Sequence, residues 1–313
     1  MGDQAHRQGR MTKHIAVLKG GWSAEREVSL VSGAACAKAL RERGYRVDEI
    51  DVGRDVAEKL SALKPDIAFN ALHGRFGEDG CMQGLLEILH IPYTHSGVLA
   101  SALAMDKPMA KRMFEAAGLR CPHGVPVLRE EFGKGDPLPR PYVIKPANEG
   151  SSVGVHMVTR EDNRPLALIA AEAADHPYLA EAYIPGRELT VAVLNGRPLG
   201  VTELRPAQGF YDYANKYTDG RTLHLCPAPI HGRAYDEAMA AALAAHRALG
   251  CRGLTRADFR YDDTQGEPGV LYLLEINTQP GMTPLSLSPE QAAHAGIDFH
   301  TLVDMLVKAA ELG

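Results

Sequence analysis

The sequence predicts an α/β protein with more than one domain. Its 313 residues are enough for two or three domains, since one domain commonly spans about 100 to 200 residues. Up to about residue 96, segments of strand character alternate with segments of helical periodicity, which is typical of a small parallel α/β domain. From Tyr142 to Leu204 the periodicity is mostly that of β-strands. We therefore expect a parallel α/β domain followed by parts of different architecture.

Composition favours small-molecule chemistry. The net charge of −5, from 34 basic and 39 acidic residues, gives no general attraction to nucleic acid or to anionic membranes. No run of about 18 apolar residues is present that could span a bilayer. The five cysteines occur singly, which argues against a disulfide framework or a zinc ribbon and favours a reducing, cytoplasmic location. Residues 1–12 lack the apolar core of a signal peptide and are expected to be a disordered leader.

Residues 13–98 are expected to form the N-terminal domain. The runs HIAVL, YRVDEIDV and DIAFNAL have strand character, and helices are predicted at 26–44, 56–63 and 82–89. Glycine-rich loops, KGGWSAE and HGRFGEDG, follow the first and third strands. Ligands of parallel α/β domains bind at the carboxyl ends of the strands, so these loops are expected to face a ligand.

Residues 99–185 are expected to form a central lobe. One helix is predicted from Leu99 to Leu119, across Met105-Asp106-Lys107, and another at 166–174. The stretch KPANEGSSVG, which begins at Lys145, lies between two strands. A turn explains such a cluster of Asn, Gly and Ser. We favour an anion site, because glycines let backbone N–H groups approach phosphate oxygens while serines and a lysine add donors and charge.

Residues 186–313 are expected to form the C-terminal domain. A polar, tyrosine-rich loop at 206–221 is longer than most connections within a domain, and such loops are often lids or binding loops. After it we predict a helix at 233–249, strands at 253–261 and 270–277, a short helix, and a last amphipathic helix at 299–310.

The two late strands indicate a metal site. The turn sequence DDTQGEPG should pair them antiparallel with Asp258 opposite Glu275, and side-chain alternation places Asn277 on the same face as Glu275. Opposed carboxylates repel unless a cation lies between them, and ligands that are all oxygen select Mg²⁺ or Mn²⁺. The alternative is an ion pair of these carboxylates with Arg256 or Arg260.

Seven blocks of the sequence resemble the D-alanine-D-alanine ligases of the ATP-grasp superfamily: GGWSAEREVSL, ALHGRFGEDG, MDK, KPANEGSSVG, FYDYANKY, GLTRADF and LLEINTQPGMT. The resemblance extends from about residue 13 to the C-terminus. It implies an N-terminal parallel α/β domain and two α+β parts that grip ATP between two sheets. It also implies ligation of two D-alanines through an acyl phosphate for peptidoglycan precursors, with ATP and two Mg²⁺ (or Mn²⁺) ions as cofactors, in a homodimer.

For the nucleotide, the resemblance implies three groups of contacts. Contacts to the phosphates are implied for Lys107, Lys145 and Lys216. The loop that closes over the γ-phosphoryl group is implied to be Glu149, Ser151, Ser152 and Val153. Adenine is implied to lie against Glu181 and the backbone of Tyr183 and Ile184, with the ribose hydroxyls on Glu188. From the residues alone, this last segment is a strand with an exposed acidic residue.

For the amino acids, the resemblance implies a donor site, an oxyanion site and an acceptor site. The residues are Glu25 for the donor ammonium group with His73 nearby, Arg256 and the Gly281 backbone N–H for the oxyanion, and Ser286 and Leu287 for the acceptor carboxylate. Tyr217 is implied to be hydrogen-bonded to Ser151 and Glu25, with Ser151 helping to orient the catalytic end. From the residues alone, Glu25 is a first-turn helix acid and His73 is structural.

Three alternatives stay open at this point. D-lactate or D-serine could replace the second D-alanine, although Tyr217 favours an amine acceptor. A catalytically silent ATP-binding protein is opposed by the presence of every charged residue that the mechanism needs. A Rossmann dehydrogenase is disfavoured because GGWSAE lacks the G-x-G-x-x-G spacing.

Overall fold

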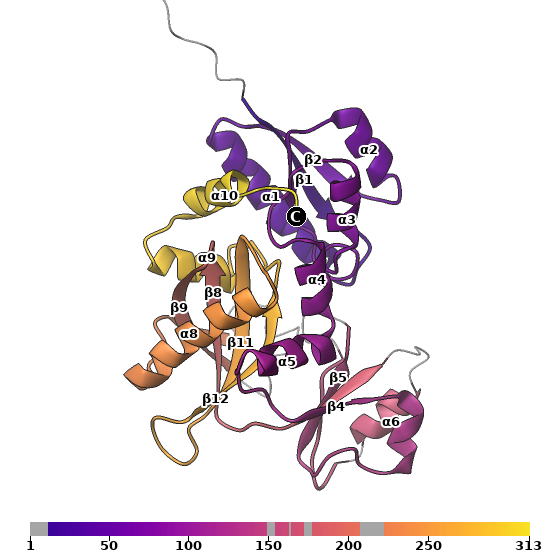
Figure 1. Ribbon diagram of the computed structural model, residues 1–313, viewed down its shortest axis with the longest axis vertical. Coiled ribbons are helices and arrows are strands. Elements are labelled where there is room, and N and C mark those ends of the chain that lie inside the picture. The colour runs from indigo at the N-terminus through magenta and orange to yellow at the C-terminus, as the bar shows by residue number, and fades with distance from the viewer. Residues whose placement is uncertain (1–11, 149–153, 163, 172–176, 207–221) are drawn as a thin grey trace, which may run out of the picture.

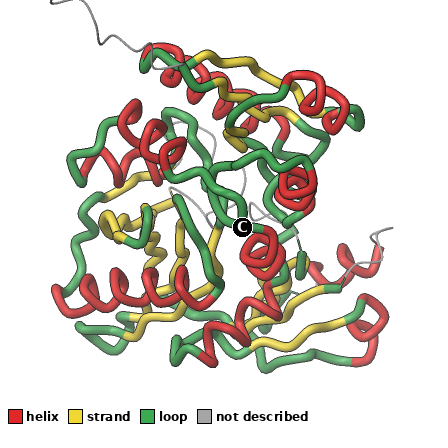
Figure 2. The backbone as a smooth tube through the Cα atoms, turned by 45° about the horizontal axis from the view of Figure 1, so that its top comes forward, coloured by secondary structure: helices red, strands yellow, loops and turns green. Residues whose placement is uncertain are grey.

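The computed structural model describes residues 12–148, 154–162, 164–171, 177–206 and 222–313. Within these residues the strands form three sheets, one of three strands, one of four and one of five. Figure 1 shows the three sheets along the long axis of the molecule, and Figure 2 shows helices packed around each group of strands. No helix in these ranges has both the length and the apolar composition needed to cross a bilayer.

The first sheet is parallel, as predicted, with strand order β2-β1-β3. Its elements alternate along the chain: β1 (His14–Gly20), α1 (Arg26–Glu42), β2 (Arg46–Val52), α2 (Val56–Leu63), β3 (Ile67–Asn70) and α3 (Cys81–Ile88). Both faces of β1 are buried, which explains its continuous apolar run. Ile15 and Val17 pack with α1, whereas Ala16 and Leu18 pack with α2 and α3.

The helix predicted from Leu99 to Leu119 is wrong, because the chain forms two helices there, α4 (Val98–Met105) and α5 (Lys107–Ala116). Asp106 between them is extended, and its side chain accepts a hydrogen bond from the Met109 N–H at 3.0 Å. Pro108, in the first turn of α5, has no N–H to bond back as a continuous helix requires. An N-cap followed by proline therefore overrides the apolar periodicity.

The central sheet is antiparallel, with strand order β4-β7-β5-β6. Its elements are β4 (Gly124–Val127), the short 3-10 helix η1 (Arg129–Lys134), β5 (Tyr142–Pro146), β6 (His156–Val158), α6 (Arg164–Ala171) and β7 (Tyr178–Ala182). A hydrophobic core that includes Phe132, Tyr142 and Tyr178 fills the space between this sheet and its helices. The glycine-rich loop predicted to close over phosphate lies mostly outside the described residues.

The third sheet is also antiparallel, with strand order β10-β9-β8-β11-β12. Its elements are β8 (Arg187–Leu194), β9 (Arg197–Pro206), β10 (Thr222–Leu225), α8 (Gly232–Ala248), β11 (Leu254–Asp262) and β12 (Val270–Asn277), followed by α9 (Leu287–His294) and α10 (Phe299–Lys308). Ala257 and Phe259 of β11 pack with α8. Side-chain alternation therefore turns Arg256 and Asp258 to the opposite face. The predicted loop after β9 lies almost entirely outside the described residues.

Helix α10 returns to the first sheet, as Figure 1 shows. Leu302 and Leu306 share one hydrophobic core with Ile15 and Leu40, and the Tyr45 hydroxyl donates a hydrogen bond to Asp304 at 2.7 Å. The predicted domain limits, 13–98, 99–185 and 186–313, stay predictions. The hydrophobic core of the N-terminal domain therefore includes a helix from the other end of the chain.

Candidate active site

The late hairpin has the predicted register at its carboxylates. Asp258 pairs with Glu275 and Arg256 pairs with Asn277, and a bulge between Asp258 and Phe259 shifts the register toward the turn. The Arg256 guanidinium donates two hydrogen bonds to Asp258, each of 2.8 Å, and the Thr190 hydroxyl donates a third of 2.7 Å. The predicted alternative, an ion pair with a neighbouring arginine, is therefore present at Asp258.

Lys107 and Glu275 connect the hairpin to the start of α5. The Lys107 Nζ lies 4.0 Å from the Glu275 Oε2. The Lys107 N–H also donates to the Ala147 carbonyl at 3.1 Å, which fixes the start of α5 against the end of β5. The break at Asp106 makes this bond available, since the first N–H groups of a helix have no partner within it. Burial lowers the pKa of Lys107, and Glu275 acts against that shift.

Glu181 binds two lysines deep in the central sheet. Its two carboxylate oxygens lie 2.5 Å from Lys111 and 2.5 Å from Lys145 respectively. Only 3% of Glu181 is exposed, so its interpretation as an exposed strand residue is wrong. Burial disfavours its charge, but the two lysines outweigh burial and lower its pKa. Lys145 is buried as well, and Glu181 and Glu275 outweigh that burial and raise its pKa.

Sequence reasoning missed Lys111. It follows Lys107 by four residues on α5, so both side chains lie on the same face of that helix. The Lys111 ammonium donates to the Pro122 carbonyl at 2.5 Å as well as to Glu181. The sequence signal that could have found it is a second lysine at helical spacing, four residues after the lysine of the MDK block.

Arg260 contacts several residues of the segment predicted to bind adenine and ribose. Its guanidinium donates to the carbonyls of Ile184 at 3.1 Å and Gly186 at 2.7 Å. It also lies 3.7 Å from the Glu188 carboxylate and 6.0 Å from the centre of the Tyr183 ring. The backbone of Tyr183 and Ile184 and the carboxylate of Glu188 are thus held around one cation.

Glu25 is the N-cap residue just before α1, and only 6% of it is exposed. A Cβ on Gly74 would lie 3.0 Å from the Glu25 Oε2, so this carboxylate lies close against the loop after β3. That loop belongs to the HGRFGEDG block predicted to face a ligand.

His73 links the first domain to the loop after β12. Its Nε2 lies 3.2 Å from the Ser32 hydroxyl, which accepts a hydrogen bond of 3.2 Å from the Met282 N–H. The ring also donates to the Gln279 backbone, and burial lowers the pKa of His73. Burial therefore favours the neutral ring, and both of its nitrogens lie within hydrogen-bond distance of a partner.

Gly281, predicted for the oxyanion, lies beside Ser286, predicted for the acceptor, in the segment just before α9. The Ser286 hydroxyl accepts a hydrogen bond of 2.9 Å from the Thr283 N–H and lies 2.8 Å from the Thr283 hydroxyl. A Cβ on Gly281 would approach the Ser286 Oγ to 2.9 Å, so a larger residue at this position would require Ser286 to move. Leu287 follows as the first residue of α9 and is buried.

Some predicted residues lie outside the described parts of the chain. They are Glu149, Ser151, Ser152, Val153, Lys216 and Tyr217. Their assignments stay predictions.

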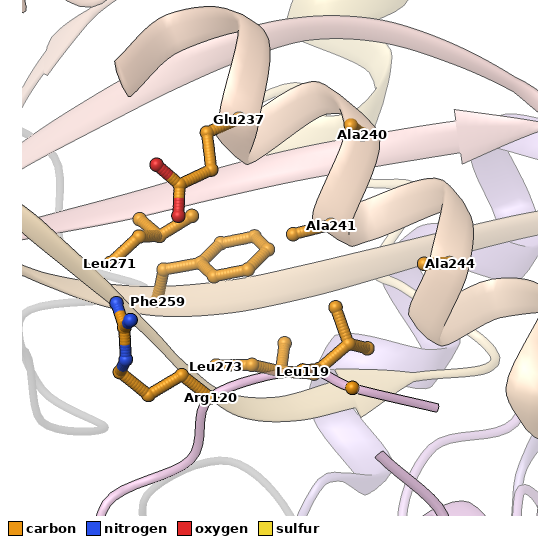
Figure 3. Close-up of a pocket in the computed structure, with 10 residues that line it drawn as sticks. Leu119, Arg120, Glu237, Ala240, Ala241, Ala244, Phe259, Leu271 and Leu273 are labelled. Atoms are coloured by element: carbon orange, nitrogen blue, oxygen red, sulfur yellow. The ribbon is translucent and has the colours of Figure 1, made fainter. Parts of the chain in front are cut away.

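A hollow of about 320 Å³ lies on the other face of the hairpin, between α8, the sheet and the segment after α5. Figure 3 shows Phe259, Leu271 and Leu273 in its wall, with Arg120 and Glu237 at one side. The lining contains none of the predicted site residues. It is therefore separate from the charged site.

Comparison with known proteins identifies the family. A family model described as D-ala D-ala ligase C-terminus matches residues 115–308, and one described as D-ala D-ala ligase N-terminus matches residues 48–96. The chain belongs to the D-alanine-D-alanine ligase family. It is 59% identical to the D-alanine-D-alanine ligase of Parvibaculum lavamentivorans over 95% of this chain and 97% of that protein. It is 57% identical to that of Granulibacter bethesdensis over 95% and 98%.

Solved structures of the ligase family give the same result for the fold. The D-alanine-D-alanine ligase of Bacillus anthracis complexed with ATP superimposes with a TM-score of 0.80 at 30% identity, over 95% of this chain and 97% of that one. A second structure of a Bacillus anthracis ligase gives 0.82 at 34% identity, with the same coverage. The predicted ATP-grasp fold, with a parallel α/β domain and two further α+β parts, is confirmed.

Proposed function

We propose that this protein joins two D-alanines to D-alanyl-D-alanine while ATP is converted to ADP and phosphate. The observation that carries the proposal is that charged groups suited to phosphates, ammonium and an oxyanion converge from all three sheets. Lys107 lies 4.0 Å from Glu275 on the hairpin, while Lys145 lies in the central sheet. Relatives that are 54–59% identical over nearly the whole chain carry the ligase name.

The chemistry has two steps. A carboxylate oxygen of the first D-alanine bonds to the γ-phosphorus of ATP as the bond to ADP breaks. The deprotonated amine of the second D-alanine then attacks the acyl phosphate carbonyl, and the tetrahedral intermediate expels phosphate. Lys107 and Lys145 neutralise phosphate charge. Arg256 and the Gly281 N–H act as oxyanion donors, each contributing about 3 to 4 kcal/mol of barrier lowering.

The hairpin also fits a divalent cation. Asp258, Glu275 and Asn277 offer only oxygen ligands, and two of them face each other across the strands. The described residues hold no group of three or more His, Cys, Asp or Glu suited to a metal, so substrate phosphates and water would complete the ligand set. Mg²⁺ or Mn²⁺ there, two ions in all, would neutralise phosphate charge in the reaction.

The proposal also covers the pathway, the cellular compartment and the oligomeric state of the enzyme. We place it in peptidoglycan precursor synthesis in the cytoplasm, as a homodimer. The five cysteines are all unpaired, which fits a reducing compartment. Light scattering of the purified protein tests the dimer.

The experiment that tests the activity is phosphate release from ATP and Mg²⁺. D-alanine, L-alanine, D-lactate and D-serine are added singly and in pairs, and the products are identified by mass. Release that depends on D-alanine, with D-alanyl-D-alanine as product, is expected. A mixed product with D-lactate or D-serine would change the acceptor, and ATP binding without any release would indicate a silent protein.

A further inference from the structure

Glu78 is a buried carboxylic acid with no part in the proposed function so far. It lies in the loop between β3 and α3, and only 7% of it is exposed. Its Oε1 accepts a hydrogen bond of 3.0 Å from the Gly74 N–H. Its Oε2 is buried and has no hydrogen-bond partner among the described residues. A buried polar atom without a partner costs about 1 to 3 kcal/mol, which indicates that a ligand supplies the partner.

The loop around Glu78 is held firmly, so the unpaired oxygen does not reflect a loose segment. The Gly77 carbonyl accepts hydrogen bonds from the side chains of Asn70, at 2.9 Å, and Gln83, at 3.0 Å. The Gly80 N–H donates to the Gln83 side chain at 3.1 Å. Elements on both sides of the loop therefore fix the position of Glu78.

Glu25 and Glu78 lie on either side of Gly74. The Gly74 N–H binds Glu78, while the place of a Cβ on Gly74 lies 3.0 Å from the Glu25 Oε2. The two acids also interact electrostatically. The pKa of Glu78 is raised to about 8, first by burial and then by the charge of Glu25. A cation that contacts both carboxyl groups would favour the ionised form of each.

The remaining charged neighbours come from the other two parts of the molecule. Arg256 on β11 lowers the pKa of Glu78 and Glu275 on β12 raises it. The charge of Glu78 in turn acts to raise the pKa of Lys107 at the start of α5. Glu78 thus belongs electrostatically to the centre of the charged site.

A primary ammonium group suits this position. It carries three N–H donors and one positive charge, so it can bond to two carboxylates at once. We propose that Glu78 is a second carboxylate for the ammonium group of the donor amino acid, beside Glu25, and that it selects α-amino acids over carboxylic acids that lack the amine. This proposal rests on the proposed ligase function.

The test isolates the donor site by using hydroxylamine in place of the acceptor. Hydroxylamine attacks the acyl phosphate, so that D-alanine hydroxamate forms and phosphate leaves. The KM for D-alanine is measured from this product, and propionate, which is D-alanine without its amine, is measured as a competitive inhibitor. Glu78→Gln keeps the acceptor for Gly74 but removes the acid.

Glu78→Gln is expected to raise the KM for D-alanine roughly 10- to 100-fold, the effect of losing one hydrogen bond to a charged group. The inhibition constant of propionate and the KM for ATP are expected to stay within about threefold, since neither ligand presents an ammonium group to Glu78. If Glu78 had a purely structural role, its replacement would weaken the binding of D-alanine and of propionate equally. That equal loss, or an unchanged KM for D-alanine, would overturn the proposal.

Two further variants complete the experiment. Asp79→Asn removes a charge from the next residue, whose side chain accepts from the Cys81 N–H, and should leave both constants unchanged. Glu78→Asp keeps the acid but withdraws it, so a smaller rise in the KM for D-alanine is expected, and this variant carries the test if the glutamine variant does not fold. If the wild type forms no hydroxamate, the proposed function fails. If the wild type forms the hydroxamate but its KM for D-alanine equals that of Glu78→Gln, the proposed function stands and this inference alone fails.

Discussion

Glu78 and Glu181 are two buried acids whose surroundings treat them in opposite ways. Burial, with Glu25 and Glu275 nearby, raises the pKa of Glu78 to about 8, so it is protonated at neutral pH. Glu181 is as deeply buried, but its two lysines outweigh that burial and keep it ionised. One acid is ready to take a cation, and the other already has its cations.

The raised pKa of Glu78 predicts a stability that depends on pH. Its pKa in the unfolded chain is near 4.5, so between pH 4.5 and about 8 the folded protein binds more protons than the unfolded one. The contribution of Glu78 to stability therefore falls as pH rises, by up to about 1.4 kcal/mol per pH unit. Urea unfolding of the wild type and of Glu78→Gln at pH 5.5, 6.5 and 7.5 measures it. The stability of the variant relative to the wild type should increase at each step in pH. Free energies of unfolding that change in parallel with pH would contradict the prediction.

Replacing Lys111 with Met should leave one oxygen of Glu181 without its cation. Breaking a buried ion pair on one side costs about 3 to 5 kcal/mol, because an uncompensated charge remains. The free energy of urea unfolding is the measurement. Lys38→Met is the matched control, since the Lys38 side chain is 78% exposed and should change stability by less than about 0.5 kcal/mol. Equal effects of the two changes would mean that Lys145 alone satisfies Glu181.

At the scale of elements, the sequence predicted the patterns with strong periodicity and missed what depends on single residues. Three parallel strands with helices between them follow from apolar runs that burial on both faces explains. The hairpin register at Asp258 followed from its turn, whereas the bulge beside it left no mark in the sequence. The prediction of one continuous helix across Asp106 was wrong because the apolar periodicity continues through the N-cap and the proline that separate α4 from α5.

Ion pairs between distant segments lay beyond sequence reasoning. Glu181 was expected to be exposed because a lone acid in a strand usually is, and its partner Lys111 lies 70 residues away in the chain. Glu78 was passed over for the same reason, since its burial depends on the packing of Asn70 and Gln83 around its loop. The assignments of Ser151 and Tyr217 rest on the resemblance alone.

The junction of α4 and α5 gives a prediction about a cap. Asp106→Ala should cost about 1 kcal/mol of stability through the lost bond to the Met109 N–H. Because the same junction holds the Lys107 N–H against Ala147, the KM for ATP should rise while the KM for D-alanine changes little. Asp106→Asn retains a capping oxygen and is the control. A stability loss with an unchanged KM for ATP would confine Asp106 to a structural role.

The hairpin gives a prediction about the metal. Glu275→Gln should raise the Mg²⁺ concentration needed for half-maximal rate and reduce turnover, because it removes a charged oxygen ligand. Stability should change little, since 28% of the Glu275 side chain is exposed and its lysine partner is 4.0 Å away. Initial rates across a Mg²⁺ series provide the measurement, with Asp262→Asn at the far end of β11 as the control. Near-normal turnover at limiting Mg²⁺ would contradict the metal assignment.

At the scale of the whole molecule, the site depends on contacts that join the first sheet to the last. The Met282 N–H binds Ser32 on α1, and the Gln279 side chain donates to the Leu72 carbonyl. Helix α10 adds its apolar face to the core around β1. The donor and acceptor sites are therefore positioned by one connected body.

That shared core predicts how the molecule responds to a distant cavity. Leu306→Ala should cost about 2 to 5 kcal/mol, because Leu306 is fully buried between α10 and the first sheet. Amide hydrogen exchange in β1 should accelerate along with exchange in α10. Leu168→Ala on α6, where the side chain is 58% exposed, is the control and should change neither. Unchanged exchange in β1 would show that the two ends of the chain are stable independently.

The return of α10 to the first sheet also has a consequence during synthesis on the ribosome. The strands of the N-terminal sheet and α1 emerge early, but the last helix that packs into their shared core begins at Phe299, about 200 residues after residue 98. At about 5 to 20 residues per second, the nascent domain waits roughly 10 to 40 s for that helix. Throughout this interval an apolar surface around Ile15 and Leu40 is open to chaperones, so the earliest part of the enzyme to be translated is among the last to be finished.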